Sequence, residues 1–293
     1  MLNIDQKKFK EIHKKKQNQI LYLSLKTNGN KEILNLINNF LIDNNIINKI
    51  IKIGNINKNK TVLEIGAGYG NLSNKIISLK PKKLIAIEKD KKLSLFLENK
   101  FSNIQNLKVV NDDILNILKK DNLDQNVIVF GNLPYNISTK ILATLILKEK
   151  WPPWYEMLIL MFQKEVADRI LAKTRTKEFS RLSVLSNWRL EIKKHFNVSK
   201  NCFFPKPKIN STVLSFIPKR NNKFDLKNPK NLEKVTRILF SNRRKMINKN
   251  FVKIFGKYKS VSESLNLNLS KRPGELDNEM FYKIAMRYEK LFN

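Results

Sequence analysis

Four short apolar runs recur along the first half of the chain, and residues with a helical spacing of apolar positions follow them. The runs cover residues 61–65, 84–87, 107–110 and 127–130 and are rich in valine, isoleucine and leucine. Strands that alternate with helices at this interval are typical of a parallel sheet with helices on both faces. We therefore predict an α/β fold with a doubly wound, mainly parallel sheet.

Helical periodicity marks two further regions. Between residues 33 and 53 it predicts two helices, and Asp43 is placed to cap the second of them. The basic stretch 219–257 also carries apolar residues at helical spacing, namely Leu232, Val235, Leu239, Met246 and Ile247. This spacing predicts a helix with three cations around one exposed face, Arg243, Arg244 and Lys245.

The pattern divides the chain into three parts. Residues 1–30 form a basic arm with little apolar periodicity, which is either solvated or in contact with RNA. Residues 31–218 form the main α/β domain, and residues 219–293 form a small helical domain.

A glycine-rich turn follows the first run. Glycines stand at alternate positions, Gly66, Gly68 and Gly70, so the chain can turn tightly and a ligand can approach the backbone. Many strand-to-helix turns use glycine for packing alone, and the final glycine of the dinucleotide fingerprint is missing. Glu64 precedes the turn, and Glu88 ends the next run, where a carboxylate can bind the two ribose hydroxyls of a nucleoside.

Two polar turns follow the third and fourth runs. Asp113 belongs to an acidic turn that can accept the amino group of a cofactor adenine, or can cap a helix. Residues 132–135, Asn-Leu-Pro-Tyr, place an amide, backbone carbonyls and an aromatic ring at the carboxyl end of a strand. Such groups can accept both hydrogens of an exocyclic amine and stack on a base, which predicts a site for a nucleobase amine.

The net charge indicates a polyanionic partner. Fifty-seven Lys and Arg residues against 25 Asp and Glu residues leave +32, distributed along the whole chain. Such a charge favours nucleic-acid binding, although lysines of a biased composition can also be plain solvated surface. The basic stretch 219–257, with 13 cations against Asp225 and Glu233, is the strongest candidate for RNA contact.

Few residues suit other kinds of chemistry. Cys202 is the only cysteine, and only two histidines are present, His13 and His195, so we predict no disulfide framework and no metal site. No apolar run approaches the length that spans a bilayer. The amino-terminal residues lack a secretory core and a transit-like composition, and we expect a cytoplasmic protein.

Taken in order, these motifs resemble the ribosomal RNA adenine dimethyltransferase family, a group of class I methyltransferases that use S-adenosylmethionine, and its KsgA branch in particular. The resemblance covers about residues 35–290. Besides residues 132–135, it is carried by residues 64–71, 161–169, 203–211, 240–245 and 272–276.

The resemblance implies roles for individual residues. The cofactor would be bound by Asn39, Leu41, Gly66, Glu88, Asp113 and Asn132. Asn132 and Leu133 would accept the hydrogens of the target amine, Pro134 would fix the turn, and Tyr135 and Phe204 would stack on the base. Phe203 is an alternative to Phe204. The family glutamine is replaced by Asn38, so the segment before residue 39 departs from the pattern.

The implied activity is the dimethylation at N6 of two adjacent adenines near the 3′ end of 16S ribosomal RNA, within a maturing small subunit. The expected state is a monomer that binds no membrane. Two alternatives stay open: the branch that modifies one adenine of large-subunit RNA, and a non-catalytic member that only binds nucleic acid. A DNA adenine methyltransferase is disfavoured, because those enzymes usually carry an acid at the position of Asn132.

Overall fold

The computed structural model describes residues 39–292 except 121–122, 149, 222 and 257–258. Residues from Phe40 onward form one compact unit. The predicted basic arm, Asn38 and the first of the two helices predicted between residues 33 and 53 lie outside the described residues. The second helix is α3 (Asn44–Ile53), and the predicted cap is confirmed, because Asp43 Oδ1 accepts hydrogen bonds from the backbone nitrogens of Asn45 and Ile46 at 2.8 and 3.1 Å.

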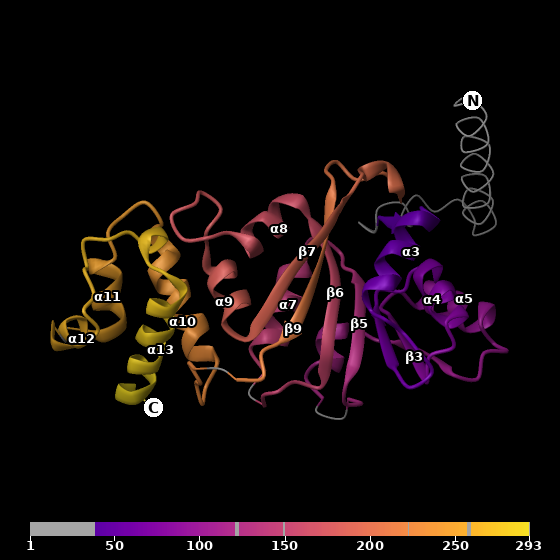
Figure 1. Ribbon diagram of the computed structural model, residues 1–293, viewed down its shortest axis with the longest axis horizontal. Coiled ribbons are helices and arrows are strands. Elements are labelled where there is room, and N and C mark those ends of the chain that lie inside the picture. Colours follow the sequence, from indigo (N-terminus) through magenta and orange to yellow (C-terminus); the bar gives the residue numbers. More distant parts are fainter. Residues whose placement is uncertain (1–38, 121–122, 149, 222, 257–258, 293) are drawn as a thin grey trace. The chain divides into compact units, whose positions relative to one another are not determined.

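A seven-stranded sheet forms the centre of this unit (Figure 1). All neighbouring strands are parallel except for the pairs that β9 makes with β6 and β7. The predicted doubly wound, mainly parallel sheet is therefore confirmed. The strands in spatial order are β4 (Leu107–Asn111), β3 (Lys83–Glu88), β2 (Thr61–Ile65), β5 (Val127–Asn132), β6 (Tyr155–Gln163), β9 (Ser211–Pro218) and β7 (Leu190–Val198).

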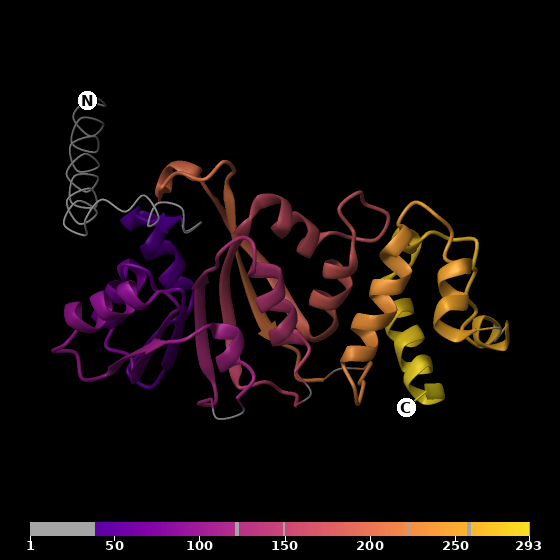
Figure 2. The same cartoon turned by 180° about the vertical axis from the view of Figure 1, so that it is seen from behind.

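Helices cover both faces of the sheet (Figures 1 and 2). Successive residues of β2 point to opposite faces: Val62 packs in one apolar cluster with Ile50 of α3, whereas Leu63 packs in another with Ile141. Both faces are apolar, as expected for a parallel sheet buried between helices. The remaining helices of this part are α4 (Asn71–Ser78), α5 (Lys91–Lys100), α6 (Ile114–Ile117), α7 (Ser138–Ile146), α8 (Lys164–Leu171) and α9 (Arg181–Arg189).

A separate two-stranded ribbon lies outside the main sheet. It pairs β1 (Phe40–Leu41) with β8 (Phe203–Phe204) in antiparallel orientation, opposing Phe40 to Phe204 and Leu41 to Phe203. The 3-10 turn η1 (Lys200–Cys202) precedes β8. Paired residues of a ribbon share a face, and Leu41 and Phe203 are both buried in the cluster that contains Ile50.

The carboxyl-terminal part of the chain is helical. It contains α10 (Lys230–Leu239), η2 (Phe240–Asn242), α11 (Asn248–Phe255), α12 (Lys259–Ser264), η3 (Pro273–Glu275) and α13 (Asn278–Phe292). Leu232, Val235 and Leu239 of α10 are buried in the same apolar cluster as Trp188 of α9. This cluster extends into the sheet, and the division at residue 218 stays a prediction.

The prediction that Arg243, Arg244 and Lys245 lie on a helix is wrong, because these residues form a turn between α10 and α11. The apolar positions on either side fit one helical period, yet the chain leaves the helix at Phe240, whose ring stacks on Phe281 with centroids 5.2 Å apart. Ile247 is buried beyond the turn, and its backbone N–H donates a hydrogen bond to Lys271 O at 2.9 Å. Met246, expected on the apolar face, is 53% exposed.

No helix among the described residues is long and apolar enough to cross a membrane.

Candidate cofactor and adenine site

The glycine turn after β2 is open toward a pocket only at its first glycine. Gly66 and Gly68 have φ values of 71° and 55°, in the left-handed region that favours glycine. A β-carbon on Gly68 would lie 2.8 Å from the Phe40 ring, so that glycine is needed for packing. A β-carbon on Gly66 would meet only Asn132 O, at 3.9 Å. The space in front of Gly66 is therefore where a ligand can approach the backbone.

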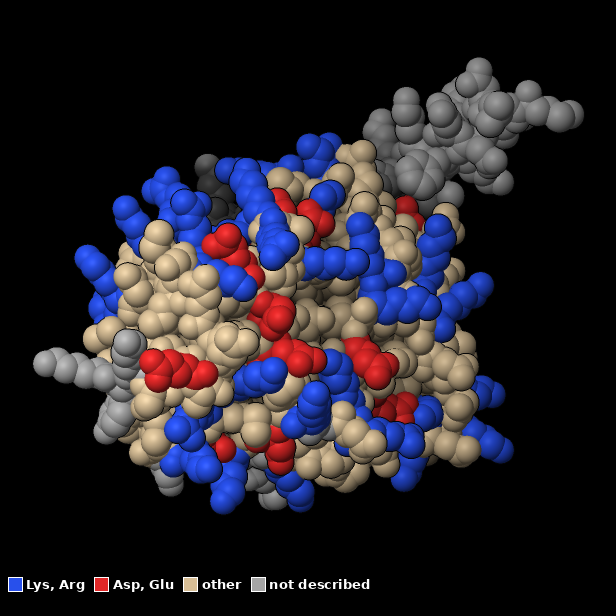
Figure 3. All heavy atoms as spheres, turned by 60° about the vertical axis from the view of Figure 1, so that its left-hand side comes forward, with Lys and Arg blue, Asp and Glu red and all other residues tan. Residues whose placement is uncertain are grey.

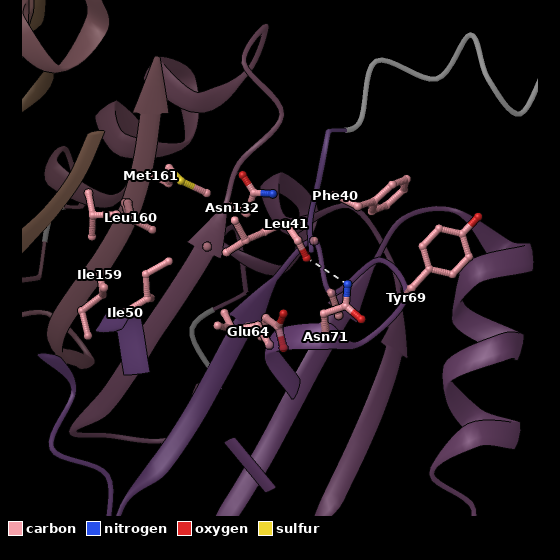
Figure 4. Close-up of a pocket in the computed structure, with 15 residues that line it drawn as sticks. Phe40, Leu41, Ile50, Glu64, Tyr69, Asn71, Asn132, Ile159, Leu160 and Met161 are labelled. Carbon is pink, nitrogen blue, oxygen red and sulfur yellow. Dashed lines mark hydrogen bonds between the residues drawn. The ribbon is translucent and has the colours of Figure 1, made fainter. Parts of the chain in front are cut away.

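The pocket lies at the carboxyl ends of β2 and β5 (Figure 4). Three of the predicted cofactor contacts, Leu41, Gly66 and Asn132, line it together, although they come from segments far apart in sequence. In an open parallel sheet, ligands bind at the carboxyl ends of the strands, so the position agrees with the predicted site. The other lining residues include Phe40, Ile50, Glu64, Ala67, Tyr69, Asn71, Leu160 and Met161.

Glu88 connects the end of β3 to the glycine turn. Its carboxylate is buried and accepts hydrogen bonds from the backbone nitrogens of Gly68 at 2.8 Å and Asp90 at 2.9 Å. Glu88 does not line the pocket itself. Each oxygen still has acceptor capacity, so the predicted role at a ribose stays compatible with the geometry.

Asp113 caps α6, which is the structural alternative given above. Its Oδ1 accepts from Leu115 N at 2.9 Å, and its Oδ2 lies 3.1 Å from Lys89 Nζ. Burial acts to raise the pKa of Asp113, but the Leu115 hydrogen bond and Lys89 outweigh it and leave the pKa below its ordinary value. A contact with the cofactor adenine stays a prediction.

Glu64 is a site residue to which the sequence assigned no role. It is 3% exposed, lines the pocket and accepts a hydrogen bond from the Ser73 hydroxyl. Burial raises the pKa of Glu64 to about 8; the Ser73 hydrogen bond opposes this shift, the charge of nearby Glu88 adds to it, and Lys100 opposes it. The raised pKa favours the protonated carboxyl at neutral pH. An acid inside an apolar strand just before a glycine turn was the only signal in the sequence.

The turn after β5 presents Asn132 to the pocket. Asn132 is the last residue of β5 and is opposed to Met161 of β6. The backbone nitrogens of Ile137 and Ser138 donate to Pro134 O at 3.1 and 3.0 Å, which holds the turn.

Tyr135 is fixed at both ends. Its hydroxyl is 2.9 Å from Ser211 Oγ, and its carbonyl accepts from Ser138 Oγ at 3.2 Å. The ring is half-buried, so part of it is accessible to a base.

The two phenylalanines of β8 differ in burial. Phe203 is buried in the core, whereas Phe204 is half-buried on the other face of the ribbon. Phe204 is therefore the only one of the two that can meet a base. The stacking of Tyr135 and Phe204 on an adenine stays a prediction.

Comparison with known proteins places this geometry in a family. The sequence profile described as "Ribosomal RNA adenine dimethylase" matches residues 29–290. The chain belongs to the ribosomal RNA adenine dimethylase family. The predicted resemblance is thereby confirmed.

Members of the dimethylase family match along almost their whole length. The chain is 48% identical over 253 residues to "Ribosomal RNA small subunit methyltransferase A" of Pelagibacter ubique (strain HTCC1062), covering 86% of this chain and 95% of that protein. Among solved structures, a dimethyladenosine transferase from Plasmodium falciparum has a TM-score of 0.70 at 28% identity, with 86% and 98% of the two chains covered. The 23S rRNA methyltransferase ErmE has a TM-score of 0.62 at 21% identity, covering 85% and 99%, which shows a common fold.

Residues 243–245, the basic turn, are exposed, but Arg243 differs from the other two in its hydrogen bonds. The Arg243 guanidinium donates hydrogen bonds to Thr176 O at 3.4 Å and to Lys177 O, so it ties the turn to the loop between α8 and α9. Arg244 and Lys245 extend into solvent. Figure 3, in which the helical part is turned forward, shows Lys and Arg side chains around a smaller central group of acids.

The part of the chain that the structure describes has neither a metal-binding group nor a histidine beside the pocket. No group of three or more His, Cys, Asp and Glu residues there could hold a metal ion. His195 lies on the edge strand β7, 2.8 Å from Ser215 Oγ, and β6 and β9 separate it from β5.

Proposed function

We propose that this chain transfers methyl groups from S-adenosylmethionine to the N6 nitrogens of two adjacent adenines near the 3′ end of small-subunit ribosomal RNA. The observation that carries the proposal is that Gly66 and Asn132 border one pocket, with the Gly66 β-carbon position 3.9 Å from Asn132 O. A ligand against the turn is therefore within reach of Asn132. The name of the Pelagibacter relative supports the choice of small-subunit RNA.

The residues present fit S-adenosylmethionine. Gly66 leaves space for the methionine part beside Leu41 and Asn132. The buried Glu88 carboxylate is placed to accept ribose hydroxyls, as in related α/β folds, and Asp113 is placed one strand further along the same edge. When bound, this cofactor supplies a methyl group already activated by its positive sulfur.

The protein's task is then to prepare and position the amine. The N6 amine of adenine is a weak nucleophile because its lone pair is delocalised into the ring. Asn132 Oδ1 and Leu133 O accept its two hydrogens, so that the nitrogen can become tetrahedral and expose the lone pair. The hydrogen bonds to Pro134 O keep this turn in place.

Tyr135 and Phe204 hold the base during this step. Ser211 fixes the Tyr135 hydroxyl, and β1 fixes the backbone of Phe204. Stacking on aromatic faces contributes about 1–3 kcal/mol per base. After transfer the proton on N6 leaves to water, and no general base is required.

The RNA outside the target adenines meets the basic turn and the surrounding cations. We place the reaction on a maturing small subunit in the cytoplasm, with the chain acting as a monomer. The RNA contact is supported by the net charge of +32 and by the exposure of Arg244 and Lys245.

The decisive experiment incubates the protein with methyl-labelled S-adenosylmethionine and small subunits that lack the modification. We expect label in two adjacent adenines near the 3′ end of 16S RNA, found by mapping the modified nucleotides. Label only in large-subunit RNA would contradict the proposal in favour of the other branch. Label in no RNA, with RNA binding retained, would support the non-catalytic alternative.

A further inference from the structure

Asn71, the residue directly after the glycine turn, forms part of the pocket wall. Asn71 is the first residue of α4 and follows Gly70 directly. Its Nδ2 donates a hydrogen bond of 2.9 Å to Leu41 O, thirty residues earlier in the chain (Figure 4). Both Asn71 and Leu41 line the pocket. The bond therefore joins two walls of the same pocket.

The segment that accepts the hydrogen bond from Asn71 is the two-residue strand β1. On one side, β1 is paired with β8, and Ile42 N donates to Cys202 O at 2.9 Å. On the other side, the Phe40 ring covers Gly68 and meets Tyr69 edge-on at 4.8 Å. Asn71 adds a side-chain hydrogen bond on this second side, so among the described residues its loss would leave only apolar packing between β1 and the turn and helix α4.

The identity of residue 71 is not explained by the stability of α4. Asparagine is a poorer helix former than alanine by about 0.6 kcal/mol. The cap of α4 is Gly70, which makes no side-chain cap hydrogen bond. The Asn71 amide is instead used on Leu41, a residue expected to contact the cofactor.

We propose that Asn71 is a positioning residue that orients the Leu41 carbonyl and holds Phe40 and Leu41 against the cofactor. The role rests on the proposed function, since it assumes that the cofactor occupies this pocket. Its effect extends to the target base, because Phe40 is opposed to Phe204 across the ribbon. A shift of β1 would thus disturb both substrates of the reaction.

Two substitutions test the role through binding alone. Asn71→Ala removes the donor, and we expect the dissociation constant for S-adenosylhomocysteine, measured by calorimetry, to rise about three- to tenfold, the effect of one net hydrogen bond. Asn71→Asp keeps the shape without the donor and should weaken binding at least as much. An acid at a helix N-terminus is favourable, so the melting temperature of Asn71→Asp should not fall. Asn71→Asp would then bind the cofactor product more weakly without a lower melting temperature. A merely structural role predicts that affinity and melting temperature fall together.

Rescue and controls complete the design. Asn71→Gln retains an amide and should bind more tightly than Asn71→Ala. Asn74→Ala, an exposed change on the same helix, should bind as the unchanged protein does. In methylation assays with saturating RNA, Asn71→Ala should raise KM for the cofactor by the same factor. The kcat at saturating cofactor should stay within about twofold, since the lost interaction is one of binding.

The outcomes separate this inference from the proposed function. Wild-type affinity in both Asn71→Ala and Asn71→Asp would overturn the inference, whether or not the protein methylates RNA. A loss in Asn71→Ala that Asn71→Asp does not share would overturn it as well. Weaker binding in both variants, with no methylation of 16S RNA by the unchanged protein, would support the inference and reject the proposed function.

Discussion

Ionisable residues are placed in opposite ways around the pocket and on the basic turn. At the ends of β2 and β3, Glu64 and Glu88 are buried and receive hydrogen bonds from a hydroxyl and from backbone N–H groups. On the turn between α10 and α11, Arg244 and Lys245 are exposed. The protonation of a buried carboxyl group depends on its surroundings and on pH, whereas exposed charges are screened by salt.

This difference teaches where specificity can reside. The pocket depends on a few atoms in fixed positions, so single substitutions should have large effects there. The basic turn contributes to a field summed over many cations, so each substitution should have a small effect that varies with ionic strength. The predictions below test this contrast from the largest expected effect to the smallest.

Asn132→Ala should cause the largest loss. It removes the oxygen that accepts a hydrogen of the target amine, and we expect the rate of methyl transfer in single-turnover assays to fall by about 10²–10³, as when one preorganised hydrogen-bonding group is removed from an active site. Binding of S-adenosylhomocysteine should persist. Asn136→Ala, exposed on the same turn, is the matched control. Near-normal turnover of Asn132→Ala would disprove the positioning of the amine.

Glu64→Gln should change how stability depends on pH. The pKa of Glu64 is about 8 in the folded chain, above the ordinary 4.5. Between these values the unfolded chain has lost a proton that the folded chain keeps, so the free energy of unfolding falls as the pH rises. Glutamine is neutral throughout. We expect Glu64→Gln to be more stable than the unchanged protein at pH 8, by about 2 kcal/mol or more, and the difference to shrink toward pH 5.

Urea unfolding at several pH values between 5 and 8 measures this effect. Glu191→Gln, an exposed change on β7, is the matched control. Equal slopes for Glu64→Gln and the unchanged protein would mean that Glu64 is already ionised in the fold.

Gly66→Ala should weaken cofactor binding more than it weakens the fold. Its β-carbon would enter the space in front of the turn, and overfilling a packed site costs about 1–3 kcal/mol, or roughly 5- to 150-fold in affinity for S-adenosylhomocysteine. Gly256→Ala is the matched control, because Gly256 also has a positive φ and open space but caps α11 far along the chain. If both variants lost the same affinity, backbone strain rather than occupation of the pocket would be responsible.

The sequence signals that pointed to this pocket are local. The glycine turn directly follows β2, the ribose-binding candidate Glu88 ends β3, and Asn132 ends β5. In a parallel sheet, the ends of successive strands meet at one edge, so local motifs are enough to bring these residues together.

Long-range contacts could not be predicted in the same way. The pairing of β1 with β8 joins residues more than 160 positions apart, and neither two-residue strand has a periodicity of its own. Burial of Phe203 rather than Phe204 follows from that pairing. The hydrogen bond from Asn71 to Leu41 likewise depends on the folded position of β1.

The basic turn was misplaced for a related reason. Helical spacing before and after residues 243–245 suggested one helix, but burial of Phe240 against Phe281 and of Ile247 beside Lys271 sets the path of the chain. Both interactions are tertiary and leave no trace in local periodicity.

The smallest effects are expected on the basic turn, and Arg244 and Lys245 test it more cleanly than Arg243, whose substitution would also break its hydrogen bonds to Thr176 and Lys177. Reversing Arg244 and Lys245 to glutamate should weaken binding to small subunits by about tenfold at low salt. It should also reduce the slope of log affinity against log salt by about one for each RNA phosphate that the protein no longer neutralises.

The control makes the same change in net charge elsewhere on the helical part. Lys253→Glu with Lys283→Glu reverses two exposed lysines, one on α11 and one on α13. If the turn binds RNA phosphates, only the Arg244 and Lys245 pair should lower the slope, because counterions are released only where phosphates are neutralised. Equal losses of affinity in both pairs would assign the effect to the overall field of the protein, and the turn would then be one part of a basic surface without a phosphate site of its own.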